Sequence, residues 1–289
     1  MVTNKSERTF QWINSLFFAL LSLSMIAPLI HLLAVSLSAP KYANAKLVVL
    51  WPKGFNLDVY ETIFGLGALW RAMGVSIWIT VIGTLLTLAL CSSLSYAVSR
   101  RQMRGRIAVL QGILITFIFS APLVPTYLVI RGLGMENTLW ALIVPSALNA
   151  FYVLIMKTFF AGISGELFDS GKIDGCSEPR IYASIVMPLS KPVLATIALF
   201  HAVTQWNSYF QALLFIRSRE LYPLQIILRN MVIEDEASAV VGNMETVQAA
   251  TPEMMKAGVI LFATVPILIV YPFLQRFFVK GAMLGSLKE

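Results

Sequence analysis

The stretch "VIGTLLTLALCSSL", from Val81 to Leu94, contains no charged residue and does not alternate between apolar and polar positions. A membrane-spanning β-strand would show segments of about ten residues in strict alternation. A helix satisfies every backbone hydrogen-bonding group within its own segment, as the inside of a bilayer requires. The stretch is therefore predicted to lie in a membrane-spanning helix.

The rest of the chain has the same character. Of its 289 residues, 57% are hydrophobic and 13% are charged, and the mean hydropathy is +0.75. Windows of about 20 residues that are nearly free of charge predict six spans. They cover approximately residues 13–37, 73–98, 107–130, 139–160, 193–216 and 257–274. The predicted fold class is all-α and integral to the membrane, with residues 1–289 forming one transmembrane domain.

The charges orient these spans. Six spans place both termini on one side, which carries thirteen of the 22 Lys and Arg residues and six of the 15 Asp and Glu residues, a net charge of +7. The other side is neutral, so the positive-inside rule predicts cytoplasmic termini in a multi-pass protein of the bacterial plasma (inner) membrane. Because topology accounts for the whole positive charge, no nucleic-acid partner is expected.

A polar run, "GELFDSGKIDGCSEPRIYASIVMPLSKP", separates the fourth and fifth spans at residues 165–192. Residues 166–173 have the length of a two-turn helix, and Gly175 is placed to end it in a left-handed turn. From the residues alone, two interpretations remain open. The run is either a connector that packs on its own bundle or an element that meets a cytoplasmic partner.

A second short helix is predicted within the same run. Ser177, Glu178 and Pro179 form an N-cap followed by a proline in the first turn. Ile181 and Ile185 then lie on one face of this helix. Pro188 and Pro192 should break it before the fifth span begins.

The sequence contains neither a nucleotide-binding motif nor a cluster of metal-ligating residues. The only Gly-Lys pair, Gly171-Lys172, is followed by Ile173 and lacks the earlier glycine of a phosphate-binding loop. The two histidines, His31 and His201, lie in separate predicted spans. We therefore expect neither ATP binding nor a metal site in this chain, and no bound cofactor.

One enzymatic alternative concerns the stretch "GISG" at residues 162–165. It matches the Gly-x-Ser-Gly of intramembrane serine proteases, with Ser164 as the nucleophile and His201 as the candidate base. Such a serine should lie on a helix inside the membrane, whereas Ser164 follows the end of the apolar segment. We expect no catalytic residues, and the protease stays the weaker alternative.

The polar run resembles the cytoplasmic loop of ABC importer permeases. That loop has a Glu-Ala-Ala triplet, a glycine after three residues, and Ile-x-Leu-Pro about nine residues later. This chain has the triplet Asp169 to Gly171, then Gly175, then "IVMP" at residues 185–188. The spacing matches, while the triplet itself differs.

Three other stretches are similar to the carbohydrate branch of these permeases, in particular to the maltose-type second permease subunit. They are "PLVPTYLVIRGLGMENTLWALIVPSALNAFYVLIMKTFF" (122–160), "WNSYFQALLFI" (206–216) and "LQRFFVKGAMLGSLKE" (274–289). The subgroup most similar imports oligosaccharides and uronic-acid sugars such as alginate or aldouronate fragments. The resemblance runs from about Leu69 to the C-terminus.

The resemblance implies that residues 161–191 form a coupling loop, which docks in a groove of a separate ATPase and moves the bundle when that ATPase closes. ATP and Mg²⁺ would then bind the ATPase. Replacing the second alanine of the triplet by Gly171 lowers helix propensity by up to about 1 kcal/mol. The candidate coupling residues are Glu166, Asp169, Ser170, Gly171, Asp174 and Gly175.

The same resemblance implies partners. They are a second homologous permease chain, two cytoplasmic ATPase subunits, an extracytoplasmic solute-binding protein and membrane lipid. The binding protein is expected at the connection 217–256, which contains "IEDE" at residues 233–236. The chain would form half of a translocation pathway for a sugar or oligosaccharide, with an acidic, alginate-like sugar among the candidates.

Polar residues of the fifth predicted span are candidates for the sugar path. Four of them recur at i, i+3, i+7 and i+10, which makes one helical stripe. Amides and hydroxyls pair with sugar hydroxyls, and aromatic rings stack on sugar faces. The alternative, hydrogen bonding to the partner subunit, stays open. The stripe is His201, Thr204, Ser208 and Gln211, flanked by Gln205, Trp206, Asn207 and Tyr209, and the fourth span adds Asn149 and Tyr152.

A secondary transporter or channel is the rival from another class. It would need an intramembrane carboxylate or an ion relay. None of the six predicted spans contains Asp or Glu, which favours the importer.

Overall fold

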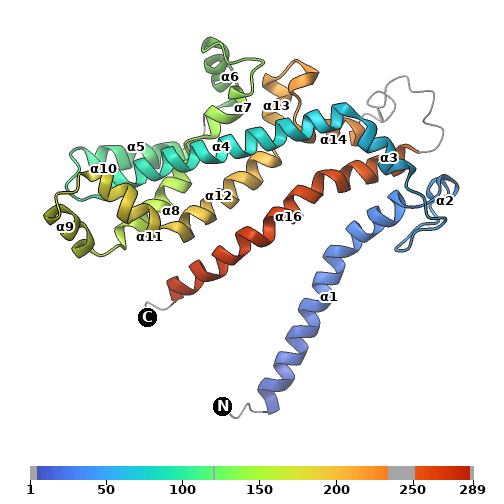
Figure 1. Ribbon diagram of the computed structural model, residues 1–289, viewed down its shortest axis with the longest axis horizontal. Coiled ribbons are helices and arrows are strands. Elements are labelled where there is room, and N and C mark those ends of the chain that lie inside the picture. Colours follow the sequence, from blue (N-terminus) through green and yellow to red (C-terminus); the bar gives the residue numbers. More distant parts are fainter. Residues whose placement is uncertain (1–4, 120, 234–250, 287–289) are drawn as a thin grey trace. The chain divides into compact units, whose positions relative to one another are not determined.

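The computed structural model describes residues 5–119, 121–233 and 251–286 (Figure 1). Every regular element in these ranges is helical. The "IEDE" run, except for Ile233, lies outside the described residues, as do residues 234–250 of the connection that contains it. The longer helices are α1 (Lys5–Ser36), α4 (Gly67–Ser99), α5 (Arg106–Ile118), α6 (Leu123–Gly132), α8 (Ala150–Ala161), α12 (Lys191–Trp206), α14 (Leu224–Ile233) and α16 (Pro252–Ser286).

Shorter helices connect these elements. They are α2 (Pro40–Asn44), α3 (Asp58–Gly65), α7 (Trp140–Ile143), α9 (Gly165–Ile173), α10 (Glu178–Ile181), α11 (Met187–Leu189) and α13 (Phe210–Phe215). Two 3-10 turns, Val144–Ser146 and Arg219–Leu221, and a π-turn, Tyr182–Val186, complete the described elements.

Three to six candidate spans are present in the described ranges. The helices α1, α4 and α16 are each long and apolar enough to cross a membrane. Three further helix pairs qualify only when each bent pair is counted as one span. These pairs are α5 with α6, the helix ending at Ser146 with α8, and the helix Glu178–Leu189 with α12. The all-helical membrane fold is therefore confirmed, and the number six stays a prediction.

The chain divides into two compact units. The first comprises Met1–Trp70 and Ile227–Val265, and the second comprises Arg71–Ile226 and Pro266–Glu289. The predicted single domain over 1–289 stays a prediction.

In the first unit, α3 packs against the beginning of α16. The side chains of Val59 and Ile63 are fully buried. Trp70 stacks on Phe64 and meets Phe262 edge to face, with ring centroids 5.9 Å and 5.2 Å away. The end of α1 is attached through its Ser36 hydroxyl, which lies 2.8 Å from the hydroxyl of Tyr60.

In the second unit, two hydrophobic clusters form at different levels of α4. The first cluster joins α4 to α8, α9, α10 and α12 through Cys91, Tyr96, Met156, Phe168 and Ile181, among others. The second cluster joins α4 to α6, α7, α13 and α14 through Ile79, Ile130, Leu142, Phe215 and Ile226, among others. Figure 1 shows α9 and α10 near the end of α4 at Ser99, and α6 and α13 toward its beginning.

The prediction of one helix through residues 193–216 is wrong. Helix α12 ends at Trp206, and a separate helix, α13, begins at Phe210. The Asn207 side chain donates to the backbone oxygen of Val203 at 2.9 Å. Asparagine and serine side chains compete for backbone groups in this way and favour helix ends. The polar residues Asn207 and Ser208 therefore lie at the break between α12 and α13, not inside one continuous helix.

The second loop helix breaks ahead of α12, as predicted, but the break lies after Pro188 rather than at it. The helix continues from Glu178 to Leu189 and bends by 80° only at the junction with α12. A π-turn at Tyr182–Val186 precedes the proline. A π-turn replaces the i→i+4 backbone hydrogen bonds of an α-helix by wider ones. We attribute the continuation of the helix past Pro188 to this change, because proline has no backbone N–H to donate to an i→i+4 bond.

Gly258 of α16 provides a test of the packing in the first unit. A Cβ atom at Gly258 would lie 2.6 Å from Val59 and 2.7 Å from Ile63. Gly258→Ala should therefore destabilise the protein by about 1–3 kcal/mol through overpacking. Thermal unfolding of the detergent-solubilised protein measures this effect.

The matched control is Gly74→Ala in α4, because no atom lies within 4 Å of that position. This change should be neutral or stabilising by about 0.5–1 kcal/mol. Equal melting temperatures for the two variants would contradict the packing of α3 on α16.

Candidate functional site

Helix α9 presents two different faces. Phe168 and Gly171 are buried on one side, whereas Ile173 is 85% exposed. Residues three, four and seven positions apart share a helix face. The exposed face, opposite to Phe168, consists of Glu166, Asp169, Ser170 and Ile173.

The end of α9 is a left-handed turn at Gly175, as predicted, with φ at +72°. The backbone N–H of Cys176 donates to Gly171 at 2.9 Å, and that of Gly175 donates to Lys172 at 3.0 Å. These two bonds are the Schellman pattern, which satisfies the last carbonyls of a helix. A Cβ at Gly175 would meet no atom within 4 Å, so the requirement for glycine is conformational. Asp174 is the C-cap residue of α9 and is exposed.

Gly171, where the importer family has alanine, lies at a close contact between α9 and the second loop helix. A Cβ there would lie 3.1 Å from Ile185 and 3.3 Å from Ile181. The predicted stripe of Ile181 and Ile185 therefore faces α9. Glycine lowers helix propensity, but here it lets the two helices of the loop approach closely.

The loop is attached to the end of α4. The Arg100 guanidinium lies 3.9 Å from the centre of the Phe168 ring. Tyr96 donates a hydrogen bond to Glu178, and Lys172 lies 3.4 Å from the same carboxylate. The Tyr96 hydrogen bond has the largest effect and, with Lys172 and Arg100, lowers the pKa of Glu178. Sequence reasoning missed Tyr96, because no spacing rule links it to a residue 82 positions away.

The predicted sugar-path residues of α12 separate into two groups. The first group packs inside the chain, with His201 3% and Gln205 2% exposed. The His201 ring lies 3.2 Å from the hydroxyl of Thr84 in α4. The Gln205 amide donates to the backbone oxygen of Leu142 at 2.9 Å, so it holds α12 against the end of α7. Trp206 is also buried.

The second group lies on open surface. Thr204 and Asn207 donate to backbone oxygens of their own helix, at Phe200 and Val203. Neither of these two bonds reaches another helix, whereas the Thr204 side chain also interacts with the Tyr152 side chain of α8. The open face consists of Thr204, Asn207 and Tyr209, which are exposed, and Ser208 and Gln211, which are partly buried.

The two candidates of the fourth span have local partners. Asn149 is the N-cap of α8, and its side-chain oxygen accepts from the backbone N–H groups of Phe151 and Tyr152 at 2.9 Å and 3.4 Å. The Tyr152 ring is buried and lies 6.3 Å from the His201 ring. Asn149 therefore supports the start of α8 after the break in the fourth span, and the place of both residues beside a sugar stays a prediction.

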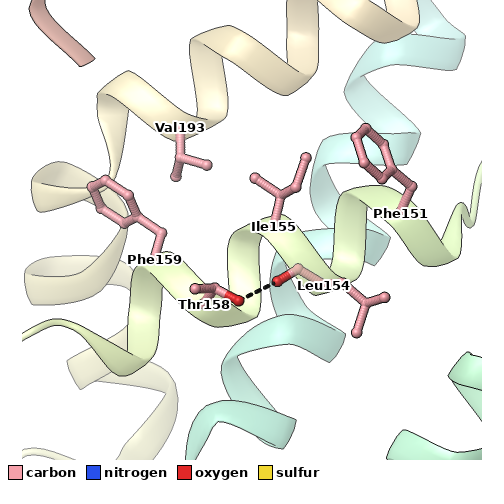
Figure 2. A pocket seen from close by; sticks show the side chains of 6 residues that line it. All are labelled: Phe151, Leu154, Ile155, Thr158, Phe159 and Val193. Carbon is pink, nitrogen blue, oxygen red and sulfur yellow. Dashed lines mark hydrogen bonds between the residues drawn. The ribbon is translucent and has the colours of Figure 1, made fainter. Parts of the chain in front are cut away.

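A groove of about 530 Å³ lies between α8 and the beginning of α12 (Figure 2). Its only polar side chain is Thr158, which donates to the backbone oxygen of Leu154 at 2.8 Å. A sugar site needs several convergent polar groups, so this groove suits hydrocarbon rather than sugar. The lining residues are Phe151, Leu154, Ile155, Thr158, Phe159 and Val193.

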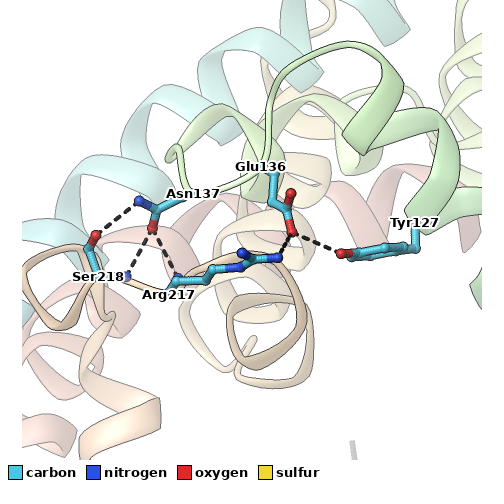
Figure 3. A network of polar contacts seen from close by, with 5 residues as sticks. All are labelled: Tyr127, Glu136, Asn137, Arg217 and Ser218. Carbon is cyan, nitrogen blue, oxygen red and sulfur yellow. Dashed lines mark hydrogen bonds and ion pairs between the residues drawn. The ribbon is translucent and has the colours of Figure 1, made fainter.

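A polar network ties the connection after α6 to the end of α13 (Figure 3). Glu136 accepts from Tyr127 at 2.8 Å and pairs with Arg217. The hydrogen bond from Tyr127, followed by the charge of Arg217, lowers the pKa of Glu136. The Asn137 side-chain oxygen accepts from the backbone N–H groups of Arg217 and Ser218 at 3.0 Å and 2.9 Å. The network fixes the segment that follows the open polar face.

The protease and metal alternatives gain no geometric support. Ser164 is the exposed residue preceding α9, and the hydrogen bond described for His201 goes to Thr84. Within the described ranges, no group of three or more His, Cys, Asp or Glu side chains is placed to hold a metal ion.

The helices and the polar loop between them define a multi-span membrane transport subunit. The chain is 41% identical over 290 residues to protein LplC of Bacillus subtilis, covering 100% of this chain and 98% of LplC. It is 40% identical over 285 residues to YtcP of the same organism, the polygalacturonan/rhamnogalacturonan transport system permease protein, covering 98% and 99% of the two chains. The chain belongs to the family of membrane-spanning permease subunits of carbohydrate ABC importers.

A solved structure agrees with this assignment. A chain of a bacterial ABC transporter involved in the import of the acidic polysaccharide alginate superposes with a TM-score of 0.88. The two chains are 27% identical, and the match covers 96% of this chain and 99% of the other. No family model matches the sequence, so the assignment depends on these pairwise likenesses.

The two groups of polar residues on α12 and α13 predict different mutational effects. Gln205→Leu removes a buried hydrogen bond and leaves the Leu142 carbonyl without this partner, which should cost about 1–3 kcal/mol of stability. Gln211→Leu changes a partly exposed side chain and should stay within about 0.5 kcal/mol. Thermal unfolding in detergent distinguishes the two. A larger loss for Gln211→Leu would reverse the assignment of the two groups.

Proposed function

We propose that this permease carries an acidic oligosaccharide and is driven by a cytoplasmic ATPase that docks on α9. The choice of sugar is supported by two relatives. One is named for the transport of polygalacturonan and rhamnogalacturonan, and the other belongs to an importer of alginate. All three polymers contain uronic acids, whose carboxylates give the chains negative charge.

The observation that carries the docking proposal is the exposed face of α9. Ile173 is 85% exposed in a polar loop that the charge distribution predicts to be cytoplasmic. Ile173 lies in the helix whose spacing resembles the docking loop of ABC importer permeases, and burial in a partner's groove would remove its apolar surface from water. Glu166, Asp169 and Ser170 lie on the same face and would form its polar rim.

The buried side of α9 makes this helix suitable for transmitting force. Phe168 lies under Arg100, and Gly171 lies against Ile181 and Ile185. The tight turn at Gly175 directs the chain back into the second loop helix. A push on the exposed face would therefore move both helices of the loop together.

The sugar would pass along the open face of α12 and α13. Thr204, Asn207, Ser208 and Gln211 offer hydroxyl and amide groups, and Tyr209, 45% exposed, offers a ring for stacking. His201 and Gln205 would support this wall from behind. One polar face does not enclose a sugar, so a second homologous permease would supply the opposite wall.

The remaining partners are those that membership of the importer family implies. Two ATPase subunits would bind ATP and Mg²⁺, one under each permease. An extracytoplasmic binding protein would meet the connection 217–256, and both termini would lie in the cytoplasm of a bacterial cell.

Reconstitution tests this proposal. The chain should be purified with its partner permease and ATPase, inserted in liposomes and supplied with the binding protein. Oligogalacturonate or oligoalginate should raise ATP hydrolysis and enter the liposomes, whereas a neutral maltooligosaccharide should do neither. Sugar uptake by this chain alone, without ATP, would instead support a secondary transporter.

A second experiment tests the docking face. Ile173→Asp should detach the ATPase, because the change places a charge in the contact that the isoleucine would bury. Copurification of the ATPase with the tagged permease should fall at least about tenfold. The control is Val49→Asp, an equally apolar position, 67% exposed, on the opposite side in the predicted topology. Wild-type copurification with Ile173→Asp would reject this docking face.

A further inference from the structure

The coupling loop contacts α4 at two positions one helical turn apart. Tyr96 of α4 donates to the Glu178 carboxylate with an O···O distance of 2.5 Å. Four residues earlier, the Ser92 hydroxyl lies 2.6 Å from the hydroxyl of Tyr182. Glu178 and Tyr182 are also four residues apart, so two pairs of residues face each other across the helices.

Two contacts constrain the orientation of the loop helix more than a single contact would. A single hydrogen bond would let the loop helix pivot about α4, whereas two bonds a turn apart also fix its direction. The Tyr96 and Tyr182 rings lie 5.3 Å apart between these bonds, an aromatic contact that adds to both. The π-turn at Tyr182–Val186 begins at the second contact, and such turns are frequent at functional sites.

Glu178 extends this attachment to α9. Its second carboxylate oxygen lies 3.4 Å from the Lys172 ammonium, with side-chain exposures of 50% and 42%. An ion pair so exposed contributes little by itself. The hydrogen bond from Tyr96, which is 9% exposed, is shielded better and is charge-assisted. The Tyr96 bond is therefore the stronger of the two links made by Glu178.

We propose that Glu178 is a positioning residue for energy coupling. By binding Tyr96 of α4 and Lys172 of α9 together, it fixes the direction of the ATPase-docking helix relative to α4. A movement of α9 then displaces α4. Helix α4 contacts α12 in the same unit, through Thr84 and His201. This inference rests on the proposed function, because it requires that an ATPase moves α9.

The test is a double-mutant cycle on the reconstituted importer. Tyr96→Phe and Glu178→Ala should each leave the ATPase bound and hydrolysing ATP, while sugar transported per ATP falls roughly tenfold. The double variant should be no worse than the worse single variant, because both remove the same link. Arg180→Ala is the matched control, an exposed change on α10 beside Glu178.

Glu178→Gln separates positioning from folding. The amide oxygen still accepts from Tyr96, but the charge is lost, so transport per ATP should fall only about threefold. A residue needed only for folding would lower the melting temperature and the yield of the complex without changing the ratio of transport to hydrolysis.

Three outcomes would overturn this inference. They are a wild-type ratio in Tyr96→Phe with the ATPase bound, additive losses in the double variant, and losses confined to yield or melting temperature. Failure of the proposed function is distinguishable, because the ATPase would then not copurify with the wild-type chain at all.

Discussion

The constraint on which this structure depends is that a bilayer offers no hydrogen-bond partner to the backbone. Every described element is therefore helical, and at two of the breaks between helices a side chain takes over a backbone group. Asn149 caps α8 after the break in the fourth span, and Asn207 bonds back to Val203 where α12 ends. The breaks are thus built by short amide side chains, and they lie beside the surface proposed for the sugar.

Close packing in this fold depends on glycine. Without water, helices associate through contact rather than through the hydrophobic effect, and small residues allow backbones to approach. Gly258 makes room for α3 in the first unit, and Gly83 makes room for His201 and Gln205 in the second. Gly171 does the same between α9 and the second helix of the polar loop. The departure from alanine in the triplet therefore has a packing reason, and it need not weaken docking on the opposite face.

Helix α4 connects the two ends of the second unit. Near its beginning, the Ser76 hydroxyl accepts the backbone N–H of Leu224 at 2.8 Å, which ties the start of α14 to α4. Near its end, Ser92 and Tyr96 hold the polar loop between the fourth and fifth spans. Between them, Thr84 meets His201 of α12. Under the proposed function, one rigid helix would thus contact the ATPase-docking loop, the support of the sugar wall and the segment that leads to the binding protein.

The sequence by itself determined the features that depend on residues close together in the chain. Charge-free windows indicated the membrane helices, and Gly175 and Ser177 marked the turn and the second helix of the loop, because caps and turns act over a few residues. Only the tertiary structure decided which polar residues of α12 are exposed and which are buried against other helices. Gln205 pairs with a carbonyl 63 residues away, and Tyr96 pairs with a carboxylate 82 residues away. Helical spacing places residues on a face, but the neighbour of that face is chosen by packing between distant segments, which no local pattern records.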